Sequence, residues 1–548
     1  MKFEDKKIKE ILLSESYVSE EDVKKAEVFA KSHKSSLVDY FLMEGIITKA
    51  LLGQAVAEFF KMNYADMILH PILAESVLRI PELIAKEYRV ALFSEKEKEV
   101  VIATDRPDKK LIPKLKKILK KNVILAYSLP EEIDSIFIHY QKSLEKRFSM
   151  IIEKQEKVAP EILEEIFEDA VTNGASDIHF EPQGKEAFIR FRIDGVLHEV
   201  GILAKEYYEN ILNRIKVQSH LRIDEHFSAQ DGAIRYFLKD KHMTVDMRVA
   251  IVPVLDGEKI VIRLLAQYVQ DFTLSGIGLS EVDETLFRTI SKKPFGMVLV
   301  TGPTGAGKTT TLYALLKTLH HPEINITTIE DPVEYKISGM NQIQVNQQTN
   351  LTFSEGLKSI VRQDPDIILV GEIRDRETAE IGVNAALTGH LLFSTFHAND
   401  SATAIPRLLD MGIEPFLLAS TLEVIVAQRL IRTICLSCRQ SQKVKQSQII
   451  KEFPKLKSFY KDSDEYVTIY KGKGCPACRN TGYRGRKALF EFLEITPEMR
   501  DLILENPSTK QIWNLAKLQG ARSLFEDGMD KVHNGITTIE EVLRVASL

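Results

Sequence analysis

The stretch GMVLVTGPTGAGKTTTLYALL, residues 296–316, constrains the fold of this chain more than any other. An apolar strand, Met297 to Thr301, runs into a glycine-rich turn ending in Lys308, and a helical pattern follows. Glycines let successive backbone N–H groups curl around phosphate oxygens, the lysine reaches the β and γ phosphates, and the next hydroxyl serves Mg²⁺. Because strand and helix flank the turn in the right order, an accidental glycine-rich turn is the weaker alternative. The predicted ATP-binding residues are Gly302, Pro303, Thr304, Gly305, Ala306, Gly307, Lys308, Thr309 and Thr310.

The strand expected to serve the magnesium ion departs from the usual pattern. In DIILVGEIRD, residues 366–375, four apolar residues end at Val370, where an acidic residue commonly follows at once. Gly371 follows instead, and Glu372 comes one place later. A second apolar run, 326–329, leads into the acidic segment EDPVEY, residues 330–335. If this strand neighbours the phosphate-loop strand, its carboxylates lie near the loop, because strand ends meet at one edge of an open α/β sheet.

We predict that acidic side chains from both strands share the hydrolytic chemistry. One carboxylate positions or deprotonates the attacking water, others hold the water shell of the metal, and the late glutamate assists. Each of these acids is alternatively an ordinary surface charge. The predicted catalytic acids are Glu330, Glu334 and Glu372.

The four cysteines of the chain occur as CLSC at 435–438 and CPAC at 475–478. In a reducing compartment, two CxxC pairs indicate a metal before a disulfide. The pairs are further apart than in common zinc ribbons, but four thiolates suit one tetrahedral Zn²⁺ in a closed structural site. Free buried thiols are the alternative. The predicted zinc ligands are Cys435, Cys438, Cys475 and Cys478.

The bulk properties narrow the class of partners. The formal net charge of −5, from 78 acidic and 73 basic residues, argues against a dedicated nucleic-acid binder, so we expect protein partners and no nucleic acid. No apolar run approaches the roughly 18 residues that span a bilayer, and the N-terminus MKFEDKKIKEILL lacks an apolar core. We expect a cytoplasmic protein.

A chain of 548 residues is expected to form roughly three or four domains. Helical periodicity, strand alternation and a charged stretch without glycine or proline suggest the boundaries. We predict a helical bundle at 1–62, an α+β module at 63–140, a helical linker at 141–158, a sheet domain at 159–272, and an α/β domain at 273–548 with the cysteine insertion at about 433–480.

The predicted sheet domain carries two arginines on one face of a strand. In AFIRFRIDGVLHEV the alternation places Arg190 and Arg192 together, and Asp194-Gly195 forms a hairpin turn. P-loop ATPases commonly recruit arginine from outside the phosphate site, so we predict that both arginines complete the site of another subunit. Alternatively they pair with surface acids such as Asp194 or Glu181.

Taken together, these motifs resemble a known family, the secretion ATPases of type II secretion systems and type IV pilus assembly, over nearly the whole chain. The phosphate loop is followed by EDPVEY as the acidic box, DPDIILVGEIRD as a Walker B with glycine before its glutamate, and TGHLLFSTFHANDS as the histidine box. The tetracysteine insertion and the segments ASDIHFEP and IRFRIDGVL also match.

The resemblance implies a RecA-like P-loop motor domain, preceded by a PAS-like α+β domain and N-terminal docking domains. It also implies Mg²⁺-dependent ATP hydrolysis, a homo-oligomeric ring that is a hexamer, and an inner-membrane platform protein as partner, which places the chain at the inner face of the plasma membrane. In the family the histidines couple nucleotide state to conformation. The coupling residues carried over are Asp331, His390 and His397. From its sequence neighbours alone, a histidine beside Thr388-Gly389 satisfies buried backbone groups equally well.

Two segments depart from the family pattern. SSLVDYFLMEGIITKALLGQAVAEFF resembles half of a motif that binds cyclic di-GMP in some relatives, but Ser35-Ser36-Leu37 replaces its Arg-Leu-Gly opening, so we do not expect that ligand. In RIDEHFSAQDGAIRY, residues 222–236, relatives carry basic residues around a Pro-Gln-Asp-Gly that are replaced here, so some arginine contacts between subunits are expected to be missing.

We therefore expect an ATPase motor that drives pilin polymerisation or pseudopilus extension. A retraction motor is disfavoured, because those relatives lack the tetracysteine insertion and the long N-terminal region. A scaffold that binds ATP without turnover is disfavoured by the complete set of acids, and a DNA translocase by the acidic balance and the lack of a basic-aromatic stripe.

Overall fold

The structure is a computed structural model that describes residues 5–14, 17–33, 36–43, 46–70, 72, 74–140, 147–148, 151–152, 158–238, 243–265, 273–346, 349–460, 463, 465–475 and 478–546. The chain divides into two units, one formed by Met1–Ile136 with Phe272–Leu548 and the other by Phe137–Asp271. Each is described by itself. Ser35 and most of the predicted linker at 141–158 lie outside the described residues.

The N-terminal segment opens with helices whose apolar residues share one buried cluster with the sheet that follows, including Phe41, Val56 and Tyr127. The helices are α1 (Asp5–Ser14), α2 (Glu20–His33), α3 (Leu37–Met43) and α4 (Lys49–Phe59). The four-stranded sheet that follows has the order β1-β4-β3-β2. Its elements are β1 (Asn63–Tyr64), α5 (Ala74–Val77), α6 (Glu82–Tyr88), β2 (Val90–Glu95), β3 (Glu99–Thr104), η1 (Lys109–Leu111), α7 (Ile112–Leu119), β4 (Asn122–Tyr127), α8 (Pro130–Ile136) and η2 (Phe137–Tyr140).

The second unit is an antiparallel sheet of six strands with two helices that pack on its apolar face. The predicted hairpin at Asp194-Gly195 is confirmed, since both residues have positive φ and Ile193 pairs with Val196. The strand order is β7-β6-β5-β10-β9-β8. The elements are α10 (Val158–Thr172), β5 (Ala175–Gln183), β6 (Glu186–Ile193), β7 (Val196–Ala204), α11 (Lys205–Gln218), β8 (Gln230–Leu238), β9 (Met243–Val254) and β10 (Gly257–Leu265).

The C-terminal part of the first unit is built on a seven-stranded sheet with the order β13-β12-β14-β15-β11-β16-β19. All neighbours are parallel except the edge strand β19, which is antiparallel to β16. The strands are β11 (Gly296–Thr301), β12 (Ile326–Glu330), β13 (Asn341–Gln344), β14 (Ile367–Ile373), β15 (Leu391–Phe396), β16 (Leu422–Ile434) and β19 (Tyr483–Glu494). The predicted α/β class, with the phosphate loop after the first strong strand, is confirmed.

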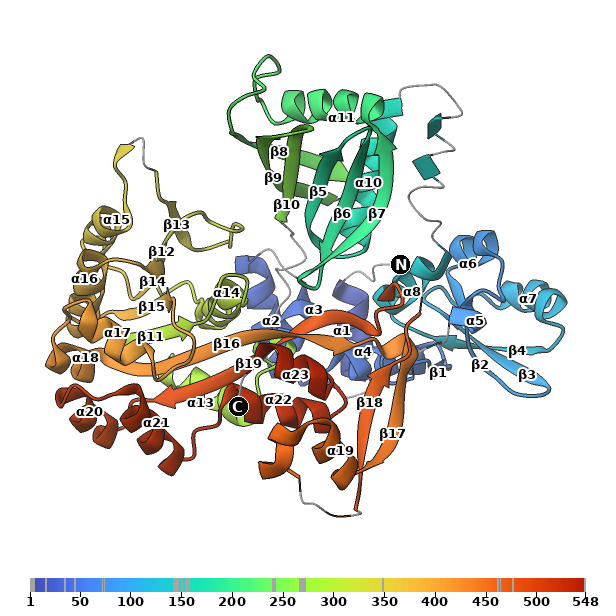
Figure 1. Cartoon of the computed structure of the whole chain (residues 1–548). Helices are drawn as coiled ribbons and strands as arrows, with labels where there is room; N and C mark the ends of the chain where they lie inside the picture. Colours follow the sequence, from blue (N-terminus) through green and yellow to red (C-terminus); the bar gives the residue numbers. More distant parts are fainter. Residues whose placement is uncertain are drawn as a thin grey trace. The chain divides into compact units, whose positions relative to one another are not determined.

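Helices cover both faces of this sheet, and Figure 1 shows α15 and α16 on the side of the strands away from α14. The helices are α12 (Leu274–Ile277), α13 (Glu281–Ile290), α14 (Lys308–Leu319), α15 (Phe353–Ile360), α16 (Arg376–Leu387), α17 (Ala404–Asp410), α18 (Pro415–Thr421), α20 (Pro497–Leu504), α21 (Thr509–Leu518), α22 (Leu524–His533) and α23 (Ile539–Val545).

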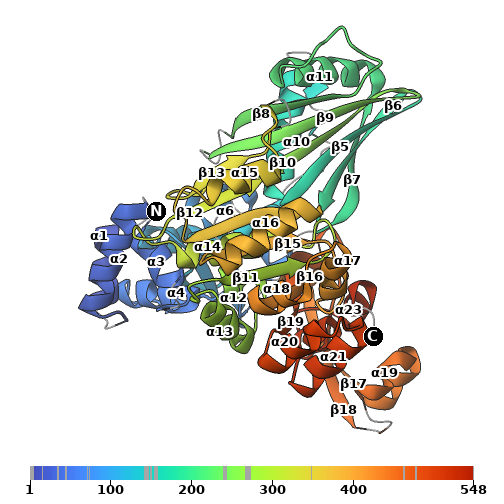
Figure 2. The ribbon, with the colours of Figure 1, turned by 90° about the vertical axis from the view of Figure 1, so that its left-hand side faces the viewer.

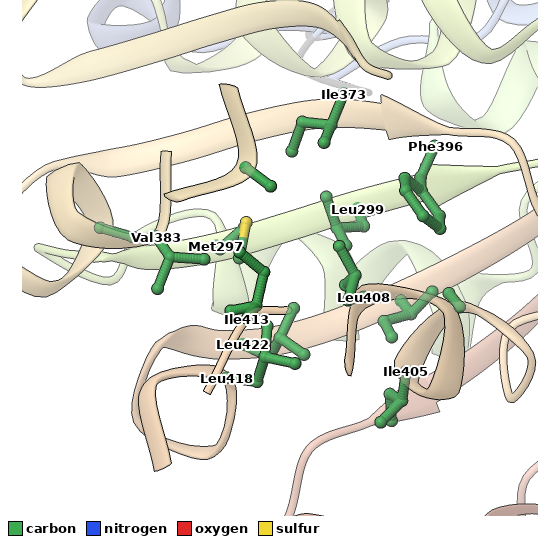
Figure 3. Close-up of a cluster of buried hydrophobic side chains, with 14 of the residues drawn as sticks. Met297, Leu299, Ile373, Val383, Phe396, Ile405, Leu408, Ile413, Leu418 and Leu422 are labelled. Carbon is green, nitrogen blue, oxygen red and sulfur yellow. The ribbon is translucent and has the colours of Figure 1, made fainter. Parts of the chain in front are cut away.

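The phosphate-loop strand β11 is buried on both faces, which explains its unbroken apolar sequence. Figure 3 shows Met297 and Leu299 pointing into a cluster with residues of α17 and α18, such as Leu408 and Leu418. The alternate residues Val298 and Val300 pack on the opposite face with α14. Each face therefore helps to fix the strand from which the phosphate loop leaves.

The cysteine insertion is a two-stranded ribbon, β17 (Arg439–Lys445) paired antiparallel with β18 (Tyr466–Gly472). It contains η5 (Leu436–Cys438), α19 (Gln446–Glu452) and η6 (Pro454–Ser458), and Figure 2 shows α19 beside the ribbon. Among the described residues, no helix has both the length and the apolar character needed to cross a membrane. The bounds of the predicted domains stay predictions.

Candidate nucleotide and metal sites

The phosphate loop connects β11 to the N-terminus of α14 and lies against β16. Gly302, Gly305 and Gly307 have φ values of +148°, +79° and +85°, which non-glycine residues rarely adopt. A Cβ at Gly302 would lie 2.5 Å from the carbonyl oxygen of Gln428, so only glycine permits this approach. Pro303, Thr304 and Gly305 are exposed, whereas Ala306 is buried. Thr309 and Thr310 are half-buried in the first turn of α14.

The Lys308 side chain folds back into the loop. Its Nζ donates to the carbonyl oxygens of Gly302 at 2.9 Å and Pro303 at 3.1 Å. Burial lowers the pKa of Lys308, and the charge of Arg429 lowers it further, while Glu372 raises it. A phosphate anion would supply the opposite charge that this ammonium requires.

Gln428 of β16 is a site residue that sequence reasoning missed. Its Nε2 donates to the carbonyl oxygen of Ala306 at 2.9 Å, and its Oε1 accepts from the Thr311 hydroxyl at 2.8 Å. The side chain is 2% exposed and ties the loop and α14 to the neighbouring strand. The available signal was an uncharged polar residue directly after the apolar run VIVA, residues 424–427.

The order of the strands corrects one sequence expectation. β12, which carries the acidic segment, does not neighbour β11, because β15 and β14 lie between them. β12 follows β11 in the sequence, but the connection through α14 places it on the far side of two other strands of the sheet. Among the three predicted catalytic acids, Glu372 lies on the strand nearest to β11. Its strand, β14, is separated from β11 by β15 alone.

Packing explains the glycine that precedes Glu372. A Cβ at position 371 would lie 3.2 Å from both Cα of Glu330 and the carbonyl oxygen of Ile329, which are backbone atoms and cannot turn away. Thr395 of β15 donates its hydroxyl to the Gly371 carbonyl at 2.7 Å, beside a shift of register. A side chain at this position would crowd the backbone of β12, which would have to shift by a few tenths of an ångström, and glycine avoids this crowding.

Glu372 meets the histidine segment and an arginine. Its Oε2 lies 3.0 Å from Nε2 of His397, and its other oxygen pairs with Arg374. Burial raises the pKa of Glu372, but Arg374 and His397 outweigh it and hold the pKa below its ordinary value. At neutral pH this carboxylate is therefore ionised and already holds two partners.

The acids that end β12 fall into two groups. Glu330 is buried, and its oxygens accept from the Thr328 hydroxyl at 2.6 Å and from the Tyr313 hydroxyl of α14. Burial raises the pKa of Glu330, and these hydrogen bonds offset only part of that rise. Asp331 and Glu334 are exposed. Glu330 thus reaches the phosphate-loop helix through Tyr313 although the strands are not neighbours.

The second predicted histidine lies differently from His397. Nδ1 of His390 is 2.9 Å from the carbonyl oxygen of Ala385, at the C-terminal end of α16. This contact matches the alternative in which His390 satisfies backbone groups. The two histidines, both assigned to coupling, thus have different partners.

Arg190 and Arg192 lie on β6 of the other unit, each facing an acid of β5. Arg190 pairs with Glu181, and the Nε of Arg192 lies 3.6 Å from Asp177. Arg190 thus has the partner named in the alternative interpretation, and Arg192 faces Asp177. Both side chains remain about one-third exposed, at 35% and 37%. Their contribution to another subunit stays a prediction.

The four cysteines converge in one cluster. Their sulfur atoms all lie within 4.8 Å of one another, with Cys435 to Cys475 and Cys438 to Cys478 at 3.8 Å. Sulfurs at the corners of a tetrahedron around Zn²⁺ are about 3.8 Å apart for a Zn–S bond of ~2.3 Å. A disulfide requires about 2.05 Å. The cluster is therefore compatible with one zinc ion.

The fold and the phosphate loop define a nucleotide-binding protein of the P-loop class. Residues 152–544 match the family described as Type II/IV secretion system protein, and residues 60–147 match the MshEN domain. The chain belongs to the type II/IV secretion system protein family, which confirms the family predicted from its motifs.

Named relatives cover most of the chain. It is 44% identical over 394 residues to the Type II secretion system protein E of Pseudomonas aeruginosa, covering 72% of this chain and 76% of that one. It is 35% identical over 559 residues to the Type IV pilus assembly ATPase PilB of the same organism, covering 97% of each. The Legionella pneumophila ATPase DotB shares the fold, with a TM-score of 0.52 and 20% identity over 71% of this chain and 95% of that one.

The contacts of Gln428 predict a role in nucleotide affinity. Gln428→Ala leaves the buried Thr311 hydroxyl and the Ala306 carbonyl without partners, at a cost of about 1–3 kcal/mol. We expect nucleotide to bind roughly tenfold more weakly or worse, measured by titration with a fluorescent ATP analogue.

Gln442→Ala, on an exposed position of β17, is the matched control and should bind as the unaltered protein does. Thermal melting of both variants shows whether weaker binding comes from global unfolding or from a local change in the phosphate loop. Wild-type affinity in folded Gln428→Ala would contradict the assignment.

Proposed function

We propose that this chain is an ATP-hydrolysing motor that powers assembly of type IV pili or of a type II secretion pseudopilus. The observation that carries the proposal is a complete phosphate loop beside an ionised glutamate, in a chain similar from end to end to a pilus assembly ATPase. The chain acts as a homohexameric ring at the cytoplasmic face of the inner membrane, through a platform protein. Neither nucleic acid nor cyclic di-GMP is part of its proposed function.

ATP and Mg²⁺ would occupy the phosphate loop. The backbone N–H groups of residues 302–307 and the ammonium of Lys308 bind the phosphates, and the hydroxyls of Thr309 and Thr310 lie at the start of α14. Mg²⁺, when bound, neutralises charge on the phosphate oxygens. The positive end of the α14 dipole acts in the same direction.

We assign hydrolysis to Glu330, Glu334 and Glu372, and among these Glu372 is best suited to orient the attacking water. It is ionised and influences the charge of Lys308. Glu372 is hydrogen-bonded to His397, so the position of His397 would change if the carboxylate left it to bind the attacking water. Glu330 supports α14 through Tyr313, and exposed Glu334 is free to approach from the sheet edge. Asp331 and His390 complete the coupling set.

The cysteine cluster would hold a structural Zn²⁺. Four thiolates leave no open position on the metal, so the ion braces the insertion and takes no part in hydrolysis. Backbone groups support the sulfurs, since the N–H of Cys475 donates to Sγ of Cys478 at 3.2 Å.

The acids and the lysine can be tested separately. We expect Glu372→Gln to reduce kcat by about 10²–10⁴-fold with nucleotide binding retained, because a neutral amide cannot take a proton. Glu330→Gln and Glu334→Gln should also slow turnover, whereas Lys308→Ala should weaken both binding and turnover. Steady-state phosphate release and nucleotide titration provide the two readouts.

Glu380→Gln, an exposed change on α16, controls for the loss of one charge and should leave turnover unchanged. If all three glutamine variants at the proposed acids hydrolysed ATP normally, the acidic site would be wrong. ATP binding without any turnover by the unaltered chain would favour a scaffold, and stimulation of turnover by DNA would favour a translocase.

The arginine pair predicts a site shared between subunits. Lys308→Ala and the double variant Arg190→Ala, Arg192→Ala should each be nearly inactive alone. Mixed rings should recover activity wherever an intact loop meets an intact arginine pair. Arg214→Ala, in helix α11 of the same unit, is a control that should hydrolyse ATP normally.

Subunit exchange is followed by energy transfer between labelled chains, so that a failure to mix is recognised. Exchange without recovered activity, or normal hydrolysis by the double arginine variant, would show that both arginines serve only their acids within the chain.

The metal assignment predicts one zinc ion per chain. Elemental analysis of protein purified without chelator should give a ratio near one, because the four sulfurs already have tetrahedral spacing. Cys438→Ser should lower that ratio and destabilise the insertion. A ratio near zero, with four thiols that react freely in the folded protein, would identify free cysteines.

A further inference from the structure

A buried polar network joins the phosphate-loop helix α14 to the end of β12. The hydroxyl of Tyr313, on α14, donates to one oxygen of Glu330, and the Thr328 hydroxyl donates to the other at 2.6 Å. Tyr313 is fully buried and Glu330 is 3% exposed. Burial and the charge of Glu330 raise the pKa of Tyr313, so its hydroxyl stays protonated and acts as a donor. A carboxylate buried at this depth is costly unless several donors converge on it.

Gln342, on the edge strand β13, connects the same network to the segment between β12 and β13. Its Nε2 donates to the Tyr313 hydroxyl at 3.3 Å and to the Tyr335 carbonyl oxygen at 3.1 Å, and it lies 3.5 Å from Glu330. Its Oε1 accepts from the backbone N–H of Ile337 at 2.6 Å. The helix, two strands and the acidic segment therefore share one set of hydrogen bonds.

Aromatic packing fixes the ring that carries the hydroxyl. The Tyr313 ring meets the Tyr335 ring edge to face, with 4.8 Å between the ring centres. The Lys317 ammonium, one turn further along α14, lies 5.5 Å from the centre of the Tyr335 ring. Edge-to-face aromatic pairs and cations over rings both favour specific geometries. The Tyr313 hydroxyl is thus held in place from its own helix and from the acidic segment.

The position of Tyr313 relates this network to the phosphates. It stands five residues after Lys308, which is about 7.5 Å along the helix axis. Glu330 directly precedes the exposed Asp331 and lies four residues before the exposed Glu334. Because β12 does not neighbour β11, no strand pairing links these acids to the phosphate-loop strand. The hydrogen bond from Tyr313 to Glu330 supplies a direct link instead.

An alternative is that Tyr313 only supports the fold, as other buried tyrosines do. Tyr208, in the second unit, is 1% exposed and donates its hydroxyl to the backbone carbonyl oxygen of Glu258. One neutral hydrogen bond to the backbone suffices there. At Glu330, by contrast, three side-chain donors converge on one carboxylate. Hydrogen bonds to a charged group are shorter and stronger than neutral ones, so they fix its position.

We propose that Tyr313 is a positioning residue for ATP hydrolysis, which holds Glu330 and the acidic segment 331–335 in register with the helix that carries Lys308. The inference deepens the proposed function and rests on it, since it explains how acids on a distant strand keep their place beside the phosphate loop. Tyr313 is fully buried, so it acts through Glu330 and not on the nucleotide.

The variant Tyr313→Phe, made in the full-length chain, removes the hydroxyl and keeps the ring. We expect kcat to fall roughly tenfold, because a displacement of catalytic groups by about 1 Å can cost ~10²-fold in rate. Affinity for a fluorescent ATP analogue should stay within about twofold, because Lys308 keeps its contacts with Gly302 and Pro303. Steady-state phosphate release and nucleotide titration measure the two quantities.

Tyr208→Phe is the matched control, because it also removes one buried hydroxyl that donates a hydrogen bond. It should lower the melting temperature about as much as Tyr313→Phe and leave kcat unchanged. Gln342→Leu removes the amide that supports both Tyr313 and Glu330, and it should lower kcat in the same way. This second variant keeps the test decisive if Tyr313→Phe melts below the assay temperature.

A double variant shows whether the hydroxyl acts through the carboxylate. If it does, Tyr313→Phe combined with Glu330→Gln should turn over no more slowly than Glu330→Gln alone, because both changes break the same link. Two losses that multiply would show that the hydroxyl acts independently of Glu330 and would overturn the assignment.

Two further results would also overturn it. One is a normal kcat in folded Tyr313→Phe, and the other is a parallel loss of kcat and nucleotide affinity, which would place the effect in the phosphate loop. Each of these outcomes leaves the proposed ATPase function intact. An unaltered chain that binds ATP without turnover would instead contradict the proposed function, and this inference with it.

Discussion

The close approach of β16 to the phosphate loop is the contact on which the nucleotide site depends. Gly302 has no room for a side chain because the carbonyl of Gln428 lies against it, and the Gln428 amide then holds Ala306 and Thr311. One residue thus joins the strand, the loop and the helix that carries Lys308. Burial makes these hydrogen bonds costly to lose, so the loop keeps its shape before a phosphate arrives.

A second close approach, between β14 and β12, determines where the acid can stand. At Gly371 a Cβ would lie 3.2 Å from backbone atoms of β12, and the register of β14 against β15 shifts between Val370 and Ile373. Glu372 therefore projects beyond this crowded point and meets His397, the residue that follows the neighbouring strand β15. The unusual glycine relieves crowding between β14 and β12. The acid that follows it, Glu372, is paired with a histidine.

Local features were predictable from the sequence, and non-local ones were not. The loop at 302–308, the turn at Asp194-Gly195 and the gathering of cysteines depend on a few adjacent residues or on paired spacing, and the structure has all three. The order of strands in the sheet depends on where each helical connection returns the chain. No short stretch of sequence therefore indicated that two strands separate β12 from β11. Gln428 had a weak one, a polar residue in an apolar strand. The burial of Glu330 under Tyr313 had none, because an acid after a strand is usually exposed.

β16, which holds the phosphate loop, and its antiparallel partner β19 also carry the cysteine insertion. The pairing of β16 with β19 runs from Val424 opposite Glu494 to Ile434 opposite Tyr483, with one shift of register between Arg432 and Ile434. Just beyond it, the N–H of Cys435 donates to the Gly482 carbonyl at 2.9 Å. At the inner end, Glu491 of β19 accepts from the backbone N–H of Ser401, in the segment that follows His397.

Figure 1 shows β16 and β19 side by side along this length. Sliding either strand by one residue would turn Gln428 or Glu491 away from its partner, because side chains alternate across a sheet. The register set beside the cysteines therefore also fixes the supports of the phosphate loop and the histidine segment. For this reason the insertion and the nucleotide site belong to one mechanical element, even though the cysteines take no part in the chemistry.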